Sequence, residues 1–274
     1  MALPITEFAP AKINLALHVT GQRADGYHLL DSLVAFADIG DHVTASAART
    51  LTLDVSGPKR EGVPTDESNL VLKAARLLGA DGAHLHLEKH LPAAAGIGGG
   101  SSDAAAALRA LSRLSGLPLP PDTERLGADI PVCLAPQCQR MEGVGERITP
   151  LPPLPNTAIL LVNPGVHQPT PAVFKELTQK TNPPLPTIPA FPTANGLIAW
   201  LKNTRNDLEP PAIQGAPVIA AVLESLSSAP LARMSGSGAT CFALFETREE
   251  AEILASALRS ARPEGWIAAA RLLP

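Results

Sequence analysis

The amino-acid sequence predicts an α+β protein with two domains. Its 274 residues correspond to one large or two modest domains. Strand-like and helix-like segments are mixed, without the strict alternation that builds a parallel sheet. The segment 151–156 is rich in proline and is the best boundary, which predicts domains at residues 1–150 and 151–274.

The first domain is predicted to begin with a strand, because Ile13, Leu15 and Leu17 alternate with polar or small residues. Asp25-Gly26 marks the turn that follows. Further strands are expected at residues 29–37, 42–47, 51–55 and 84–87, and helices at residues 69–78 and 102–115.

The second domain is predicted from shorter periodic segments. Thr247 and Glu250 form the pattern of a capping box, in which each residue can satisfy an amide of the other at the start of a helix. The proline-rich stretch 181–192 is expected to be a surface loop. Strands are expected at residues 158–162, 241–245 and 266–272, and helices at 196–202, 217–225 and 248–261.

Composition excludes several classes of protein. Hydrophobic residues make up 45% of the chain and aromatic residues 3%, which predicts a full core built from aliphatic side chains. The net charge of −4 opposes binding to nucleic acid or to an anionic membrane. The N-terminal stretch lacks a basic region and Lys12 interrupts its apolar residues, so we expect no signal peptide, and we expect a soluble, cytoplasmic protein. The cysteines (Cys133, Cys138 and Cys241) are expected to be free and buried.

A glycine-rich segment between a strand and a helix is the strongest functional signal. Gly96 and Gly98–Gly100 permit a close approach of backbone amides to a ligand, and the helix that follows can attract phosphate with its free N–H groups. The alternative is an ordinary strand-to-helix turn. So many glycines are costly in conformational entropy, which favours the phosphate site. The segment is neither a Walker loop nor a dinucleotide fingerprint, because Ser101 stands where both require a glycine.

The segment GIGGGSSDAAA at 96–106 resembles the ATP-binding loop of the GHMP kinase superfamily. Two further motifs of that superfamily have counterparts in the expected order, PAKINLAL at 10–17 and MSGSGATCF at 234–242. DGYHLLDSL, LGADIPVCL and RNDLEP narrow the resemblance to the branch that phosphorylates a methylerythritol substrate. The resemblance implies a two-domain GHMP-kinase fold with the active site and ATP loop between the domains.

This resemblance also implies the reaction and its ligands. It implies ATP-dependent phosphorylation of the 2-hydroxyl of a methylerythritol whose cytidine diphosphate moiety anchors it, a step of the non-mevalonate route to isoprenoid precursors. ATP would be the co-substrate, with Mg²⁺ on its phosphates and no protein metal ligand identified in the chain. No nucleic-acid or membrane partner is expected, and the chain would be a monomer or weak homodimer. The implied ATP-binding residues are Pro92, Ala93, Ala94, Ala95, Gly96, Ile97, Gly98, Gly99, Gly100, Ser101 and Ser102.

The same resemblance assigns two catalytic residues. Asp129 stands at the position of the catalytic base, whereas its sequence context alone also fits a helix or turn cap. Lys12 would be its charged partner, although a lysine in an edge strand is common. Asn14 shares the strand face of Lys12 and would bind substrate in the same pocket.

Four residues are implied to bind the cytidine end of the substrate. Tyr27 would supply a stacking face and His28 a hydrogen bond to the base edge, although an exposed turn is the alternative for both. Phe174 would stack on the other side of the base, and Thr170 would face the same site. Ser235–Ala239 would add backbone amides near the phosphates or substrate, and we interpret Asn206, Asp207 and Glu209 as structural.

The histidine-rich strand around residue 86 has two interpretations. His84 and His86 share a strand face with Glu88 and His90, which is a pattern that can bind a metal. The strand alternation already accounts for the pattern as a solvated face, and we favour that interpretation.

Two other functions are compatible with parts of the sequence. A kinase for another small alcohol, such as homoserine or mevalonate, would keep the glycine loop but would have no base for Tyr27 and His28 to contact. A non-catalytic nucleic-acid-binding protein would need a basic surface, which the net charge of −4 opposes.

Overall fold

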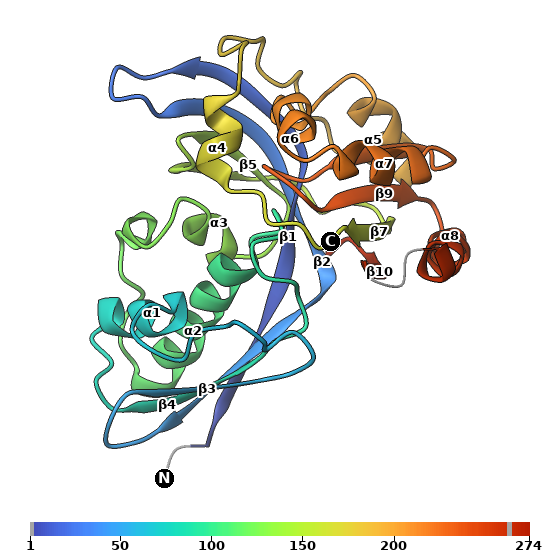
Figure 1. Cartoon of the computed structure of the whole chain (residues 1–274). Helices are drawn as coiled ribbons and strands as arrows, with labels where there is room; N and C mark the ends of the chain where they lie inside the picture. Colours follow the sequence, from blue (N-terminus) through green and yellow to red (C-terminus); the bar gives the residue numbers. More distant parts are fainter. Residues whose placement is uncertain (1–2, 262–264) are drawn as a thin grey trace. The chain divides into compact units, whose positions relative to one another are not determined.

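The computed structural model describes residues 3–261 and 265–274 (Figure 1). Its backbone contacts divide into two compact units. Unit 1 contains the described residues up to Lys12, with Ile39–Ala93 and Gly98–Pro136. Unit 2 contains Ile13–Asp38, Ala94–Ile97 and the described residues from Gln137 onward. The strands β1 (Ile5–Gln22) and β2 (His28–Ala47) contribute to both units, so this division does not follow chain order, and the boundary between residues 150 and 151 stays a prediction.

Unit 1 is built on the pairing of three strands. The β4 strand (Ala83–Glu88) pairs in parallel with β3 (Thr52–Ser56) and antiparallel with the last residues of β2. Along β4, Leu85 and Leu87 are buried while His84 and His86 are half-buried, as the alternation predicts.

The helices of unit 1 are α1 (Leu70–Leu78), α2 (Gly99–Ser115) and α3 (Ile130–Leu134), with a short 3₁₀ helix at Thr123–Arg125. Helices α1 and α2 pack against each other (Figure 1). Asn69 caps α1 by accepting a hydrogen bond from the Val71 amide, and Gly79 ends the helix in the left-handed conformation.

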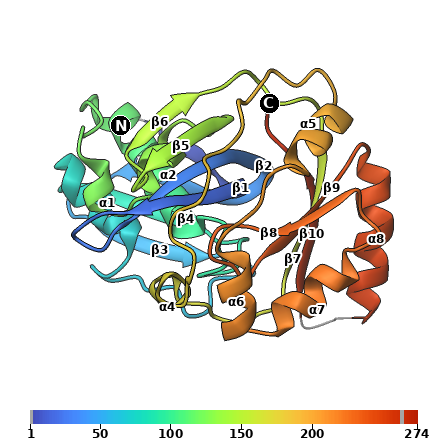
Figure 2. The same cartoon turned by 90° about the horizontal axis from the view of Figure 1, so that it is seen from above.

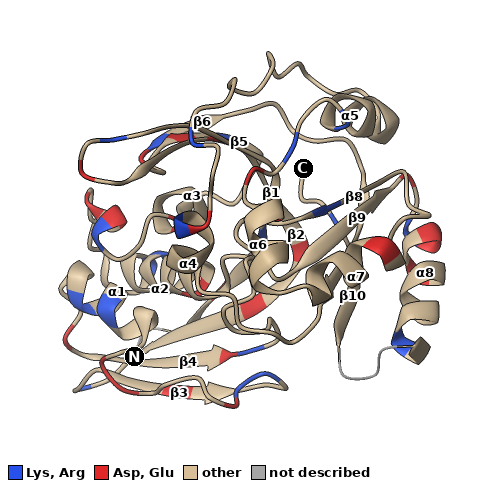
Figure 3. Cartoon of the chain, turned by 45° about the horizontal axis from the view of Figure 1, so that its top comes forward, with Lys and Arg blue, Asp and Glu red and all other residues tan. Residues whose placement is uncertain are grey.

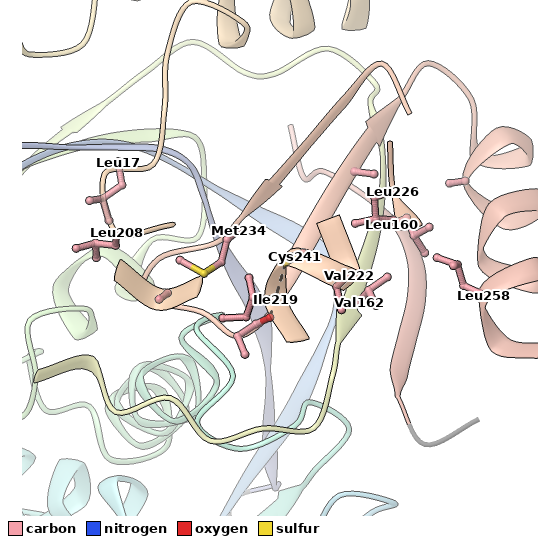
Figure 4. Close-up of a cluster of buried hydrophobic side chains, with 14 of the residues drawn as sticks. Leu17, Leu160, Val162, Leu208, Ile219, Val222, Leu226, Met234, Cys241 and Leu258 are labelled. Atoms are coloured by element: carbon pink, nitrogen blue, oxygen red, sulfur yellow. Dashed lines mark hydrogen bonds between the residues drawn. The ribbon is translucent and has the colours of Figure 1, made fainter. Parts of the chain in front are cut away.

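Unit 2 contains a second sheet of four antiparallel strands, in the order β10 (Trp266–Arg271), β7 (Ala158–Asn163), β9 (Cys241–Phe245) and β8 (Leu231–Met234) (Figure 2). Helices α7 (Val218–Ser225) and α8 (Arg248–Ala261) share a core with one face of this sheet, where Leu160 and Val162 lie near Val222 (Figure 4). The Thr247–Glu250 capping box is confirmed, because each residue accepts a backbone hydrogen bond from the other.

The remaining elements of unit 2 are short. The first half of β2 pairs with β5 (Gln139–Gly143), which pairs with β6 (Arg147–Pro150). The helices are α4 (Thr170–Lys175), α5 (Ala194–Leu201) and α6 (Glu209–Gly215).

Two of the expected boundaries were wrong. Residues 29–37 and 42–47 belong to one continuous strand, β2, because Gly40 extends the strand instead of breaking it. A Cβ at Gly40 would collide with the backbone of Ala9 on β1, so glycine is needed there for close strand approach. Helix α2 begins at Gly99, three residues earlier than expected. Gly98 is its N-cap, and Gly99 and Gly100 belong to its first turn.

Charged residues of both signs lie close together on the described elements. Basic and acidic segments are interspersed in Figure 3, for example along α8, which carries Arg248 and Arg259 beside three glutamates. No helix among the described residues is long and apolar enough to cross a bilayer. All three cysteines are free and buried, and burial raises the pKa of the Cys133 thiol to about 12.

Candidate active site

The N-terminus of α2 in unit 1 has the features of an anion site. Gly98 is its N-cap, with φ +63°, and makes no side-chain capping hydrogen bond. The first amides of a helix have no intrahelical acceptor, so the amides that follow Gly98 are available to a ligand. A Cβ at Gly98 would lie 2.9 Å from the Cβ of Lys12, so the loop requires glycine to pass this close to β1.

Lys12 and Asp129 form an ion pair within unit 1. The Lys12 Nζ lies 2.6 Å from Asp129 Oδ1, and the lysine side chain is 4% exposed while that of the aspartate is 36% exposed. Asp129 precedes α3, but its side chain makes no capping hydrogen bond, which argues against the cap interpretation. Unit 1 therefore holds the partly exposed carboxylate of Asp129 against the buried amine of Lys12.

Helix α2 is tied to the strand that carries Lys12. Ser102 Oγ donates a hydrogen bond of 2.8 Å to the carbonyl oxygen of Pro10. This buried contact fixes the first turn of the helix beside the residues that precede Lys12 on β1.

In unit 2, the middle of the glycine-rich loop packs on the Ser235–Ala239 turn. Ser235 Oγ donates to the carbonyl oxygen of Gly96 at 3.1 Å, and Thr240 Oγ1 donates to that of Ala95 at 2.5 Å. A Cβ at Gly96 would collide with the backbone of Gly238. The two glycine motifs lie far apart in the sequence. They can pack this closely because their glycines have no side chains.

Two asparagines hold this turn in place. Asn206 Nδ2 donates to the carbonyl oxygens of Met234 and Gly236, both at 2.8 Å, so the RNDLEP segment has a structural contact here. Asn14 donates two hydrogen bonds. Its backbone amide donates to Ser235 Oγ at 3.1 Å, and its Nδ2 donates to Ser32 Oγ at 2.8 Å.

Unit 2 also brings together three of the four residues expected at the cytidine end. The rings of His28 and Phe174 stack with a centroid distance of 4.9 Å and an interplanar angle of 21°. Thr170 and Phe174 are four residues apart on α4, and Thr170 Oγ1 lies 2.7 Å from Ser237 Oγ. Tyr27 is 65% exposed, and the ring contact found among the described residues pairs Phe174 with His28 and not with Tyr27.

His28 carries an unused polar atom. Its Nε2 is buried and has no hydrogen-bond partner within the described residues. Burial, with a smaller contribution from Lys180, lowers the pKa of His28 below its usual value, so the imidazole is neutral at pH 7. The ring thus offers a neutral nitrogen to a ligand.

Comparison with known proteins decides the family. Residues 69–136 match the model of the GHMP kinase N-terminal domain, and residues 190–264 match that of the GHMP kinase C-terminal domain. A relative from Dinoroseobacter shibae, named 4-diphosphocytidyl-2-C-methyl-D-erythritol kinase, is 58% identical over 97% of this chain and 94% of its own. The chain belongs to the 4-diphosphocytidyl-2-C-methyl-D-erythritol kinase family of GHMP kinases.

Solved structures agree with this family. The crystal structure of a 4-(cytidine 5'-diphospho)-2C-methyl-D-erythritol kinase matches with a TM-score of 0.78 and 32% identity, covering 98% of this chain and 99% of that one. A homoserine kinase from Cytophaga hutchinsonii, 18% identical, matches with a TM-score of 0.68 over 98% of this chain and 95% of its own, which supports the GHMP kinase fold alone.

This GHMP kinase also contains a buried ionic cluster that sequence reasoning missed. Lys89 Nζ pairs with Asp41 and, at 2.7 Å, with Asp103 Oδ2 on α2, and all three side chains are almost completely buried. Gly99 lies against the cluster, since a Cβ there would be 3.4 Å from Lys89 Nζ. The sequence signal for this cluster is the alternation of β4. Leu85 and Leu87 point into the core, and Lys89, two residues further on, is a charged residue expected on the same buried face.

The cluster predicts an unusual pH dependence of stability. Burial, opposed by Lys89 and reinforced by Asp41, raises the pKa of Asp103 to about 8. A carboxyl group whose pKa is raised on folding stabilises the native state when protonated, and this contribution declines as pH rises from about 4 to about 8. The Asp103→Asn variant cannot ionise at this position. Its free energy of unfolding should therefore increase relative to that of the parent protein as the pH rises from 5 to 8.

Urea denaturation at several pH values measures this difference. Asp81→Asn is the matched control, because Asp81 is exposed and pairs with Arg76 at the surface, where ion pairs contribute little. A stability difference between Asp103→Asn and the parent protein that stays constant from pH 5 to pH 8 would show that Asp103 is already ionised in the fold.

Proposed function

We propose that this GHMP kinase transfers the γ-phosphoryl group of ATP to the 2-hydroxyl of 4-diphosphocytidyl-2-C-methyl-D-erythritol. The observation that carries the proposal is the Lys12–Asp129 pair, with 2.6 Å between amine and carboxylate. The 58% identity to a relative of that name supports the choice of substrate.

Asp129 is the proposed base and Lys12 its charged partner. The hydroxyl oxygen of the substrate attacks the γ-phosphorus, ADP leaves, and the hydroxyl proton passes to the Asp129 carboxylate. Lys12 offsets the negative charge that gathers on the reacting oxygens. Phosphoryl transfer needs positioning and charge neutralisation more than covalent chemistry, which suits a site with a single carboxylate and a buried amine.

The proposed ATP site consists of Pro92–Ser102, with the phosphates at the N-terminus of α2. The uncapped helix start and the glycine at its N-cap support this assignment. Mg²⁺ neutralises phosphate charge in such reactions. Asp103 is paired with Lys89, so Ser101 or Ser102 is the proposed contact for an ion carried by ATP, since a hydroxyl that donates, as Ser102 Oγ does to Pro10, keeps lone pairs for an ion.

The proposed cytosine site consists of His28, Phe174, Thr170 and Tyr27, and Asn14 is a further proposed substrate-binding residue. The neutral His28 ring, with its unpartnered buried Nε2, supports a hydrogen bond to the base edge. Phe174 already stacks on His28, and the base would stack on this pair of rings.

Phe174→Ala should weaken substrate binding by about 1–3 kcal/mol, the usual contribution of a base–aromatic stack, and leave ATP binding unchanged. Phe191→Ala is the matched control, since Phe191 packs on Trp200, another aromatic contact of unit 2. Isothermal titration with the substrate and with an ATP analogue measures both affinities. Equal losses in the two variants would contradict a specific stack on Phe174.

Tyr27→Ala is expected to weaken substrate binding as well, in keeping with a base held from two sides. Tyr27 is 65% exposed, so its ring is accessible to a base. Unchanged affinity in the same titration would remove Tyr27 from the cytosine site.

The substrate class is tested by comparing three alcohols. The purified chain is incubated with ATP and either the cytidine-diphosphate substrate, homoserine or mevalonate, and ADP release is followed. We expect kcat/KM to be far higher for the cytidine-diphosphate substrate. Faster turnover of homoserine or mevalonate would instead favour a kinase for a small alcohol that lacks a base.

A further inference from the structure

A group of three metal-ligand side chains lies in unit 1, apart from the residues assigned above. One ligand atom from each of His42, Glu88 and His90 lies within 4.8 Å of the other two. His42 on β2 is the direct antiparallel partner of Glu88 on β4. His90 follows two residues after Glu88, and its Nε2 lies 2.9 Å from Glu88 Oε1.

The other histidines of this strand have different partners. The Nδ1 of His84 lies 3.0 Å from Thr52 Oγ1, and the Nε2 of His86 lies 2.9 Å from Ser56 Oγ, so both have hydroxyl partners on β3. The metal-binding pattern that the sequence offered at His84 and His86 is therefore used for strand-to-strand hydrogen bonds.

His42 differs from both. Its Nδ1 is buried and has no hydrogen-bond partner within the described residues. A buried polar atom without a partner is costly, so this imidazole is not committed to a neighbouring side chain through Nδ1 as His84 is through its own. The ring is held by contacts with Phe8, at a centroid distance of 5.2 Å, and with His90, at 6.3 Å and nearly perpendicular.

The backbone beneath the three ligands is fixed by the buried cluster. Asp41 Oδ1 accepts hydrogen bonds from the amides of His90, at 2.5 Å, and Leu91, at 2.8 Å. Lys89, which lies between Glu88 and His90 in sequence, pairs with Asp41 and Asp103. The ligands are therefore carried by a rigid frame, while their own side chains stay accessible: Glu88 and His90 are 48% and 40% exposed.

We propose that His42, Glu88 and His90 bind one divalent transition-metal ion of the zinc type. Two imidazoles and a carboxylate are the ligands that such ions prefer, whereas Mg²⁺ and Ca²⁺ favour sites made of oxygen alone. Three protein ligands leave the fourth tetrahedral position to water. The ion links β2 to the end of β4, immediately before the segment that leads into the glycine-rich loop.

The test is a titration of the full-length chain, free of any histidine tag and first treated with a chelator, with Co²⁺. Co²⁺ in a tetrahedral site of this kind gives visible absorption bands, which report coordination independently of kinase activity. We expect bands that saturate at one Co²⁺ per chain and that Zn²⁺ displaces, and we expect Zn²⁺ to raise Tm.

Variants locate the site. His90→Gln and Glu88→Gln, which change partly exposed residues, should each weaken Co²⁺ binding at least tenfold without lowering Tm in chelator. His42→Gln should abolish the bands. His84→Gln and His86→Gln are matched controls on the same strand and should bind as the parent protein does. Bands that survive His90→Gln and Glu88→Gln, equal losses in the two controls, or binding only at millimolar Co²⁺ would overturn the proposal.

Discussion

Asp129→Asn is expected to slow phosphoryl transfer by about 10²- to 10⁴-fold, the range typical of a lost general base. The amide keeps the shape and the hydrogen-bonding capacity of the carboxyl group but cannot accept a proton at neutral pH. A loose transition state places less demand on the base, which would put the loss at the low end of this range. Single-turnover kinetics with ATP and substrate both saturating isolates this step from binding.

Asp122→Asn is the matched control for this variant. Asp122 also lies in unit 1, is exposed to a similar degree, at 38% against 36%, and pairs with Arg125 at 2.8 Å. We expect it to leave the rate unchanged. A near-normal rate for Asp129→Asn would return Asp129 to a structural role.

Lys12→Ala is expected to reduce the single-turnover rate in the same assay, because it removes the charge paired with Asp129 at 2.6 Å. Residues that act as a unit are not additive, so the double variant should be little slower than the more damaging single variant. Losses that multiply would show that the two residues act independently.

Gly98→Ala is expected to weaken ATP binding at least tenfold. The new Cβ would lie 2.9 Å from the Cβ of Lys12, so the start of α2 must shift away from β1 and its amides lose their alignment. The left-handed conformation, with φ +63°, adds a stability cost of about 1–2 kcal/mol for any residue with a Cβ.

Gly116→Ala separates these two effects. Gly116 ends the same helix with φ +76°, and a Cβ there would meet nothing within 4 Å. Both variants should show the stability cost of the left-handed conformation in thermal denaturation, with a further loss in Gly98→Ala from the contact with Lys12, but only Gly98→Ala should lose ATP affinity in calorimetry. Normal ATP affinity in Gly98→Ala would contradict the placement of the phosphates at this helix.

Local periodicity was enough to predict most of the regular elements, and it failed where a residue served a contact distant in sequence. Residues 29–37 and 42–47 were expected to be separate strands, yet both lie in β2, where Gly40 allows the backbone of Ala9 to pass too close for a side chain. The strands β5, β6 and β8 and the helices α3, α4 and α6 were missed, because they are only four to seven residues long and carry little periodic signal.

The residues of the candidate site also differ in how far the sequence alone could predict them. The glycine-rich loop was recognisable from residue types alone, because its composition has few other uses. Lys12 and Asp129 each look ordinary in their own segments, and only the family resemblance paired them. The alternation of β4 singles out Lys89, Glu88 and His90, but their partners Asp41, His42 and Asp103 come from other elements, which the pattern of one strand does not reveal.

The most direct test of the proposed reaction is the identity of its product. The chain is incubated with ATP and 4-diphosphocytidyl-2-C-methyl-D-erythritol, and the product is examined by ³¹P and ¹³C nuclear magnetic resonance. We expect one new phosphomonoester signal beside an intact diphosphate, with phosphorus coupling to the carbon that bears the 2-hydroxyl. A phosphate on another oxygen, or no transfer to this substrate while ATP is consumed with a different alcohol, would contradict the proposed reaction.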